Sequence, residues 1–231
     1  MMKIVKRFIN FIYDIVFTVK CPYCKAVIPR REFACENCKK KFPMYYIKTY
    51  TVGKYTCVAP FVYKGIYAKT VKSFKFKNNG AFAKQLAVMM VSSINREYGN
   101  ENFDIITCVP MHKNSLKERR YNHSELLARE CAEKMHIPFV HTLEKYKNNQ
   151  AQHKIKASER ADNVRGVYRV INKELVRNKN ILLIDDIITT GNTLGECAKM
   201  LRLAGCKSVR CATFCVTVTG DKINLLQNAP I

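Results

Sequence analysis

The stretch that decides the fold of this chain is Ile181-Leu182-Leu183-Ile184-Asp185-Asp186-Ile187-Ile188-Thr189-Thr190-Gly191-Asn192-Thr193. Its four leading apolar residues predict a buried central strand with two carboxylates at its carboxyl end, where ligands bind in open α/β sheets. The small hydroxyl residues and the glycine that follow open a helix, so backbone N–H groups and the helix dipole can hold a phosphate. Because the acids can accept hydrogen bonds from a vicinal diol, the pattern predicts a sugar-phosphate site.

The structural alternative is an ordinary strand–turn–helix in which Thr193 caps the helix. That alternative gives no structural reason for two carboxylates, Asp185 and Asp186, at the end of a buried strand. An unpaired carboxylate in such a place costs free energy, so we favour the ligand site.

The pattern around this stretch predicts alternating strands and helices. Strands are expected as a hairpin within 50–64 and at 105–109, 139–140, 167–170, 181–184 and 208–218, and helices at 1–20, 66–75, 81–97, 122–135 and 193–204. Residues 78–80 are expected to be a turn, and the polar residues 144–163 a loop. Short apolar runs between helices favour a parallel sheet that is covered on both faces.

The composition is that of a globular protein, but the charge is not. Of the 231 residues, 48% are hydrophobic and 25% charged, and the net charge is +22. No carboxylate lies between Glu36 and Glu97, while 12 Lys or Arg residues do. Such a surface attracts polyanions such as nucleic acid or anionic lipid. The alternative is a lysine-rich composition without a specific partner, which does not explain one carboxylate-free stretch.

Eleven cysteines divide into a cluster of four and seven single residues. Cys21, Cys24, Cys35 and Cys38 form two C-x₂-C knuckles, the spacing of a structural zinc site, although a pair of redox motifs or an iron–sulfur site are alternatives. A filled four-thiolate site leaves no open position for catalysis. The single thiols indicate a reducing compartment, so we expect a cytoplasmic protein.

The N-terminal residues imitate a signal peptide, because basic residues precede an apolar run over 8–17. Asn10 and Asp14 interrupt that run, and it is too short to span a bilayer. An amphipathic helix packed on the protein is favoured over membrane association, and an integral membrane protein is not expected.

The stretch 181–193 resembles the phosphoribosyl diphosphate signature of the type I phosphoribosyltransferases at every position. The resemblance implies that Asp185 and Asp186 hold the ribose 2′- and 3′-hydroxyls. It also implies that Thr189, Thr190, Gly191, Asn192 and Thr193 cradle the 5′-phosphate. Mg²⁺ would arrive with the diphosphate of the substrate rather than in a protein cage.

A zinc ribbon ahead of a phosphoribosyltransferase domain resembles the ComF family of competence-type proteins, which are linked to DNA uptake. Three further segments carry the resemblance, namely 72–76, 119–128 and 159–166. It implies an N-terminal helix and zinc ribbon over 1–48 and a type I phosphoribosyltransferase fold, a central parallel sheet flanked by helices, over 49–231. Arg120 stands where the family commonly has Gly, and His123 where it commonly has Gln, so this sequence departs from the pattern there.

Cations of these segments are candidates to capture the diphosphate. Arg119 is the first, since a guanidinium binds phosphate bidentately, and Lys75 and Lys113 follow. The alternative for this region is a solvated helix start that is capped by Asn122 or Ser124.

Three functions remain open at this point. The chain is an enzyme that displaces diphosphate from phosphoribosyl diphosphate, a protein that binds single-stranded DNA, or a regulator with phosphoribosyl diphosphate as its effector. No residue stands out as a general base, so no catalytic residue is named. The expected partners are phosphoribosyl diphosphate or a related ribose 5-phosphate, single-stranded DNA and DNA-uptake proteins.

Overall fold

The computed structural model describes residues 18–76, 79–147 and 166–217, and the backbone of the strand 224–227. The chain divides into two compact units, Met1–Phe42 and Pro43–Ile231. Each unit is described by itself below.

The smaller unit contains short elements around the two knuckles. β1 (Val19–Lys20) pairs antiparallel with β2 (Val27–Ile28), and α2 (Glu36–Lys39) follows. Residues 1–17 of the predicted N-terminal helix lie outside the described residues. The prediction is wrong for Val19 and Lys20, because these residues pair with β2 across the first knuckle.

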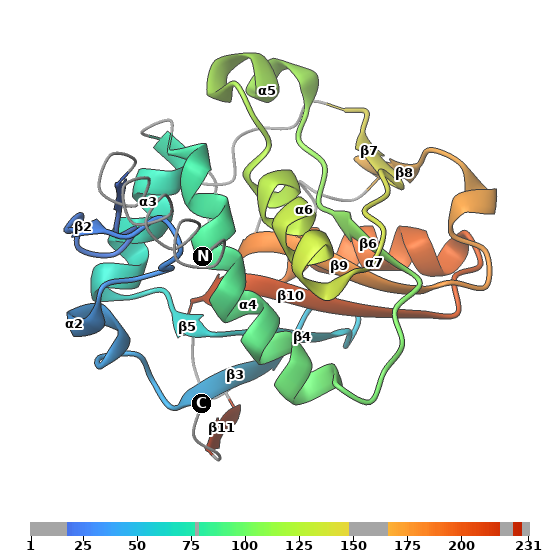
Figure 1. Cartoon of the computed structure of the whole chain (residues 1–231). Coiled ribbons are helices and arrows are strands. Elements are labelled where there is room, and N and C mark those ends of the chain that lie inside the picture. Colours follow the sequence, from blue (N-terminus) through green and yellow to red (C-terminus); the bar gives the residue numbers. More distant parts are fainter. Residues whose placement is uncertain (1–17, 77–78, 148–165, 218–223, 228–231) are drawn as a thin grey trace, which may run out of the picture. The chain divides into compact units, whose positions relative to one another are not determined.

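The larger unit is built on a mixed seven-stranded sheet with the order β11-β3-β4-β10-β9-β6, and β5 also pairs with β10 (Figure 1). The strands are β3 (Tyr45–Tyr50), β4 (Thr56–Ala59), β5 (Phe61–Val62), β6 (Ile105–Cys108), β9 (Asn180–Ile188), β10 (Ser208–Val216) and β11 (Asn224–Gln227). β4, β5 and β9 are parallel to β10, and β6 is parallel to β9. The predicted parallel sheet is therefore confirmed at the centre, while β3 and β11 add an antiparallel edge.

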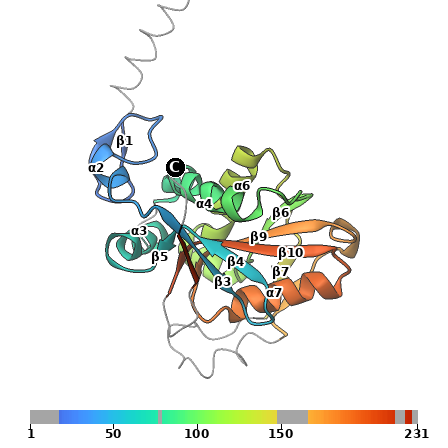
Figure 2. The ribbon, with the colours of Figure 1, turned by 90° about the horizontal axis from the view of Figure 1, so that it is seen from below.

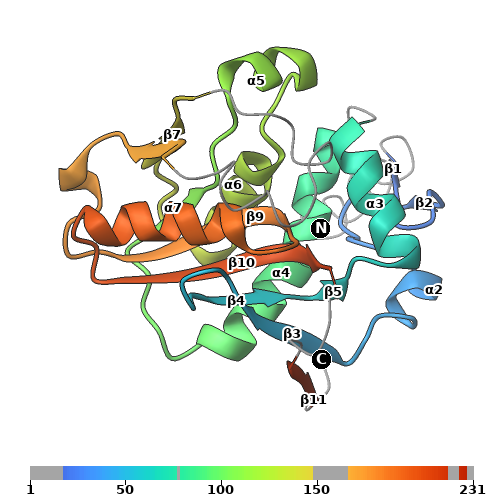
Figure 3. The same ribbon diagram turned by 180° about the vertical axis from the view of Figure 1, so that it is seen from behind.

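Helices cover both faces of this sheet. α4 (Ala83–Tyr98) and α6 (His123–Met135) lie on one face, and α7 (Asn192–Leu203) lies on the other (Figure 2, Figure 3). α4 contributes Leu86, Met90 and Ile94 to the core, at the spacing that predicted the helix. The central parallel sheet flanked by helices that was expected from the sequence is thus present.

The remaining described elements lie around this core. They are α3 (Gly65–Phe76), the 3₁₀ turns at Gly80–Phe82 and Lys173–Leu175, α5 (Lys113–Arg119), β7 (Leu143–Lys145) and β8 (Tyr168–Val170). β7 and β8 form an antiparallel pair, so the predicted loop over 144–163 begins as a strand. Residues 148–163 of that loop lie outside the described residues. The strand expected at 139–140 is a single parallel bridge between Ile106 and Phe139.

Two predicted elements have different bounds in the structure. The hairpin expected within 50–64 starts at Tyr45, because β3 pairs with β11 from Tyr45 and with β4 from Ile47. The central strand continues to Ile188 instead of ending at Ile184, because β10 pairs with it as far as Ile188. The two acids therefore lie within the strand rather than after it.

Candidate functional site

Each of the two acids of β9 is held by a different helix. The hydroxyl of Ser124, in the first turn of α6, donates to Oδ1 of Asp185 at 2.6 Å. The same oxygen accepts the backbone N–H of Asp186 at 2.8 Å. The ammonium of Lys75, near the end of α3, lies 2.8 Å from Oδ1 of Asp186. The site thus joins three segments that are far apart in the sequence.

The surroundings change the pKa values of Asp185 and Lys75. Burial, the largest cause, and the neighbouring charge of Asp186 together raise the pKa of Asp185 to about 7, against the opposing effects of Ser124 and Lys75. Burial alone would lower the pKa of Lys75, but Asp186 outweighs it and the pKa is raised. Lys75 is therefore a cation at neutral pH, whereas Asp185 exchanges its proton near neutrality.

The turn that was predicted to hold a phosphate closes on Gly191, which precedes α7 with a φ of +77°. A Cβ at this position would lie 2.8 Å from the Cα of Thr51, in the turn between β3 and β4. The backbone N–H of Val52 in that turn donates to the carbonyl of Gly191 at 3.3 Å. Both the backbone angle and the close approach require glycine here. Thr189 and Thr190 before it are partly exposed.

The first turn of α7 completes the predicted phosphate cradle. Asn192 is buried, and Thr193 is partly exposed. Thr193 shares a hydrogen bond with the hydroxyl of Tyr168 in β8, although burial is the larger effect and raises the pKa of that tyrosine. The backbone N–H groups at the start of α7 have no partner within the helix, which is the usual basis of anion binding.

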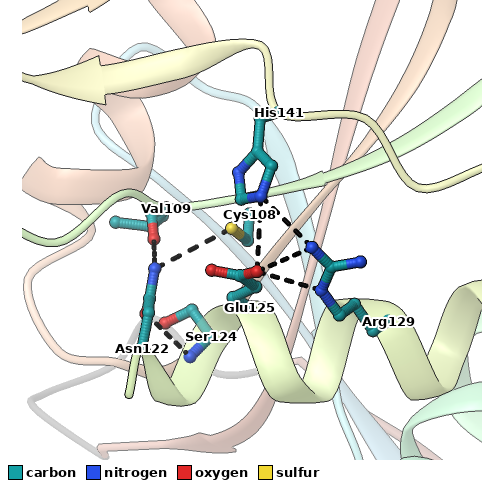
Figure 4. A network of polar contacts seen from close by, with 7 residues as sticks. All are labelled: Cys108, Val109, Asn122, Ser124, Glu125, Arg129 and His141. Carbon is teal, nitrogen blue, oxygen red and sulfur yellow. Dashed lines mark hydrogen bonds and ion pairs between the residues drawn. The ribbon is translucent and has the colours of Figure 1, made fainter. Parts of the chain in front are cut away.

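Asn122 fixes the first turn of α6, as Figure 4 shows. Its side-chain oxygen accepts the backbone N–H of Ser124 at 3.1 Å, and its amide donates to the carbonyl of Val109 at 3.0 Å. The capping residue offered as an alternative is therefore Asn122. In the same turn, Glu125 accepts a hydrogen bond from Arg129 and lies 3.3 Å from Nε2 of His141. The cap links the end of β6 to the helix that carries Ser124 to Asp185.

The candidate cations of α5 make no ion pair with the two acids among the described residues. Arg119 lies with its guanidinium 5.4 Å from the ring centroid of Phe76, a residue that is 66% exposed. Lys113 is exposed on α5. Arg120 has a φ of +66°, the left-handed conformation that glycine adopts freely. The chain keeps this geometry with an arginine, at a cost of about 1 kcal/mol.

Sequence reasoning missed the contact between Ser124 and Asp185 and the support that the 51–54 turn gives to Gly191. Ser124 was considered only as a cap. The available signal was its place in the first turn of the helix expected at 122–135, which follows the strand expected at 105–109. Nothing in the sequence of residues 51–54 indicates their contact with α7.

The four cysteines of the knuckles lie together, with their sulfur atoms all within 4.8 Å of one another. The sulfurs of Cys24 and Cys35 are 3.4 Å apart. Four thiolates at about 2.3 Å from a tetrahedral zinc ion would be separated by about 3.8 Å, so the cluster fits structural zinc.

A family model described as the phosphoribosyl transferase domain matches residues 75–223. The chain belongs to this family. Lys75, Asp185, Asp186 and the turn before α7 all lie within the matched residues of the phosphoribosyl transferase domain.

Curated relatives confirm the resemblance to the ComF family. Competence protein F of Haemophilus influenzae is 26% identical over 195 residues, which are 82% of this chain and 81% of that protein. DNA utilization protein YhgH of Escherichia coli K12 is 24% identical over 204 residues, 86% of this chain and 84% of that protein. Competence protein ComFC of Bacillus subtilis is 30% identical over 142 residues, 61% of this chain and 55% of that protein.

Among the described residues, no helix is both long enough and apolar enough to cross a bilayer.

Proposed function

We propose that this phosphoribosyl transferase domain binds phosphoribosyl diphosphate together with Mg²⁺. The observation that carries the proposal is the strand–turn–helix in which Asp185 and Asp186 precede the glycine turn of α7, with Lys75 brought to Asp186 at 2.8 Å. Asp185 and Asp186 hold the ribose hydroxyls, residues 189–193 hold the 5′-phosphate, and Lys75 and Arg119 attract the diphosphate. Mg²⁺ neutralises diphosphate charge when the two bind together.

The ion pair between Lys75 and Asp186 gives this binding a specific first step. Without ligand, the ammonium of Lys75 and the carboxylate of Asp186 neutralise each other, and both side chains are largely buried. A diphosphate competes for the ammonium, and the released carboxylate can then accept a ribose hydroxyl. Binding therefore exchanges one ion pair for two interactions with the ligand.

Calorimetry with phosphoribosyl diphosphate and Mg²⁺ tests the proposal. We expect saturable binding that Lys75→Met and Asp186→Asn each weaken by about tenfold or more, in line with the loss of a buried charged partner. Lys72→Met is the matched control, because Lys72 is exposed on the same helix. Equal binding by all variants, or no binding by the wild type, would refute the proposed site.

Turnover is a separate question from binding. Release of diphosphate in the presence of purine, pyrimidine or amine acceptors would make the chain a transferase. Its own groups would then act by stabilising the leaving group and by holding the 5′-phosphate. Binding without release across a broad acceptor panel favours the regulatory alternative, in which phosphoribosyl diphosphate is an effector.

A second function, binding of single-stranded DNA during DNA uptake, is favoured by the net charge of +22 and by the carboxylate-free stretch between Glu36 and Glu97. The names of the relatives, which refer to competence and DNA utilization, point in the same direction. We expect affinity for an oligonucleotide to fall steeply as salt rises, since counterions are released on binding. Binding that is absent at low salt, or independent of salt, would contradict this function. DNA-uptake proteins are the protein partners that this role implies.

We further propose structural zinc in the knuckles and a cytoplasmic location. The seven cysteines outside the cluster are free and buried, as expected for small apolar residues in a reducing compartment. Metal analysis of the purified protein should give about one zinc per chain, and fractionation of cells should place the protein in the soluble fraction. Substoichiometric zinc with intact folding would argue against the metal site.

A further inference from the structure

His123 is a buried histidine that contacts the main chain of a residue of the proposed site. It is 0% exposed, and its Nε2 lies 2.9 Å from the carbonyl oxygen of Lys75. Its Nδ1 has no hydrogen-bond partner among the described residues. The rings of Phe74 and Tyr121 meet the imidazole edge to face at 5.4 Å and 4.9 Å. The imidazole is therefore held in one orientation by packing and by one hydrogen bond.

The chemistry of this contact defines the form of the imidazole. A carbonyl oxygen only accepts, so Nε2 carries a proton and donates it. Burial lowers the pKa of His123, although Asp186 of β9 opposes this, and Lys75 of α3 and Arg119 of α5 lower it further. His123 is thus a neutral donor at neutral pH.

The acceptor is one of the carbonyls that a helix leaves unpaired. α3 ends at Phe76, and the last four carbonyls of a helix have no partner within it. His123 satisfies the carbonyl of Lys75, and the hydroxyl of Tyr121 donates to the carbonyl of Phe74 at 2.8 Å. These two bonds fasten the end of α3 to the start of α6, the helix that presents Ser124 to Asp185.

We propose that His123 is a positioning residue, which holds the main chain of Lys75 so that its ammonium stays against Asp186. The inference deepens the proposed function, because it names what places the cation that attracts the diphosphate. His123 itself does not touch the ligand. The role depends on the N–H donor at Nε2 and not on the basicity of the imidazole.

Three variants separate the donor from the volume of the side chain. His123→Gln keeps an N–H donor, His123→Leu fills the cavity without one, and Lys75→Met removes the cation. We expect the His123→Leu variant to bind phosphoribosyl diphosphate with Mg²⁺ about fivefold more weakly, the value of one hydrogen bond, and His123→Gln to restore binding. In the Lys75→Met background the substitution to Leu should change affinity less than twofold, because its effect passes through Lys75.

Hydrogen exchange tests the same idea without ligand. The amides of residues 73–76 should exchange faster in His123→Leu than in the wild type or His123→Gln, while the amides of α4 stay unchanged. If exchange at the end of α3 is the same in all three proteins, or if the leucine effect on binding persists in the Lys75→Met background, the inference is wrong. Failure of the wild type to bind the ligand would refute the proposed function alone, and the exchange data would still decide the role of His123.

Discussion

Replacing Asp185 by Asn should stabilise the folded protein while it removes a group assigned to the ribose. The carboxylate lies within β9, and burial together with Asp186 raises its pKa from 3.8 to about 7. The folded protein therefore carries an ionised group that it would hold more easily in the protonated form. Asn can accept the same bonds from the Ser124 hydroxyl and the Asp186 N–H, because both use one oxygen of Asp185.

The size of the gain follows from linkage. One pH unit is worth about 1.4 kcal/mol, so a rise from 3.8 to about 7 destabilises the ionised folded form by at most about 4 kcal/mol. Asp185 is only partly buried, and screening by solvent reduces this figure. We expect Asp185→Asn to raise the free energy of unfolding by about 1–2 kcal/mol above pH 7.

The pH dependence gives the reasoning a distinct signature. The pKa of Asp185 is higher in the folded than in the unfolded state, so raising the pH from about 4 to about 7 destabilises the wild type through this group. Urea unfolding at pH 8 and at pH 5.5 should therefore show a larger advantage of the Asn variant at pH 8. A variant that is less stable than the wild type at pH 8, or an advantage that does not shrink at pH 5.5, would refute the argument.

Asp186→Asn is the matched control for this experiment. It removes a charge one residue away, but it leaves the ammonium of Lys75 without the carboxylate that lies 2.8 Å from it. Loss of one partner of such a hydrogen-bonded pair costs about 1–3 kcal/mol when some solvent remains. The two neighbouring substitutions should thus move stability in opposite directions.

Three further outcomes are expected. Gly195→Ala should destabilise the larger unit by about 2 kcal/mol or more in urea unfolding, because a Cβ there would lie 2.1 Å from the carbonyl oxygen of Val52. Unchanged stability would show that the 51–54 turn shifts to make room at no cost. Removing zinc with a chelator, or replacing Cys38 by Ser, should unfold the smaller unit, so that the amides of residues 18–42 exchange rapidly while those of the larger unit's sheet stay protected. Protection of residues 18–42 that survives both treatments would argue against a metal-dependent fold. Affinity for phosphoribosyl diphosphate should fall as the pH drops below about 7, since protonation of Asp185 removes an acceptor. The decline should be smaller in Asp185→Asn, and an equal decline in both proteins would mean that another group causes it.

The fold could be predicted because its signals are local. The apolar run 181–184, the glycine turn and the start of the helix after it lie within 13 consecutive residues, and the spacing of Leu86, Met90 and Ile94 defines α4 without any knowledge of its partners. The length of β9 could not be predicted in the same way. Its last residues pair with β10, which lies more than 20 residues further along the chain.

The candidate site was predictable in its residue types but not in its contacts. Asp185 and Asp186 could be identified because they directly follow the apolar run 181–184, and Lys75 because it belongs to a segment that resembles the family. That Lys75 faces Asp186 while Ser124 faces Asp185 depends on how α3 and α6 pack on the sheet. Such long-range packing leaves no periodic trace in the sequence.

The turn between β3 and β4 sets a limit on how this protein can be cut. The family match begins at Lys75, whereas this turn closes against Gly191 from residues 51–54, and β4 separates β3 from β10. A fragment that starts at residue 75 would lack β4 and so expose one edge of β10. It would also lack the 51–54 turn, which packs against the start of α7. The residues matched by the family model are therefore fewer than those of the larger unit, and a truncation meant to isolate the candidate site should begin no later than Pro43.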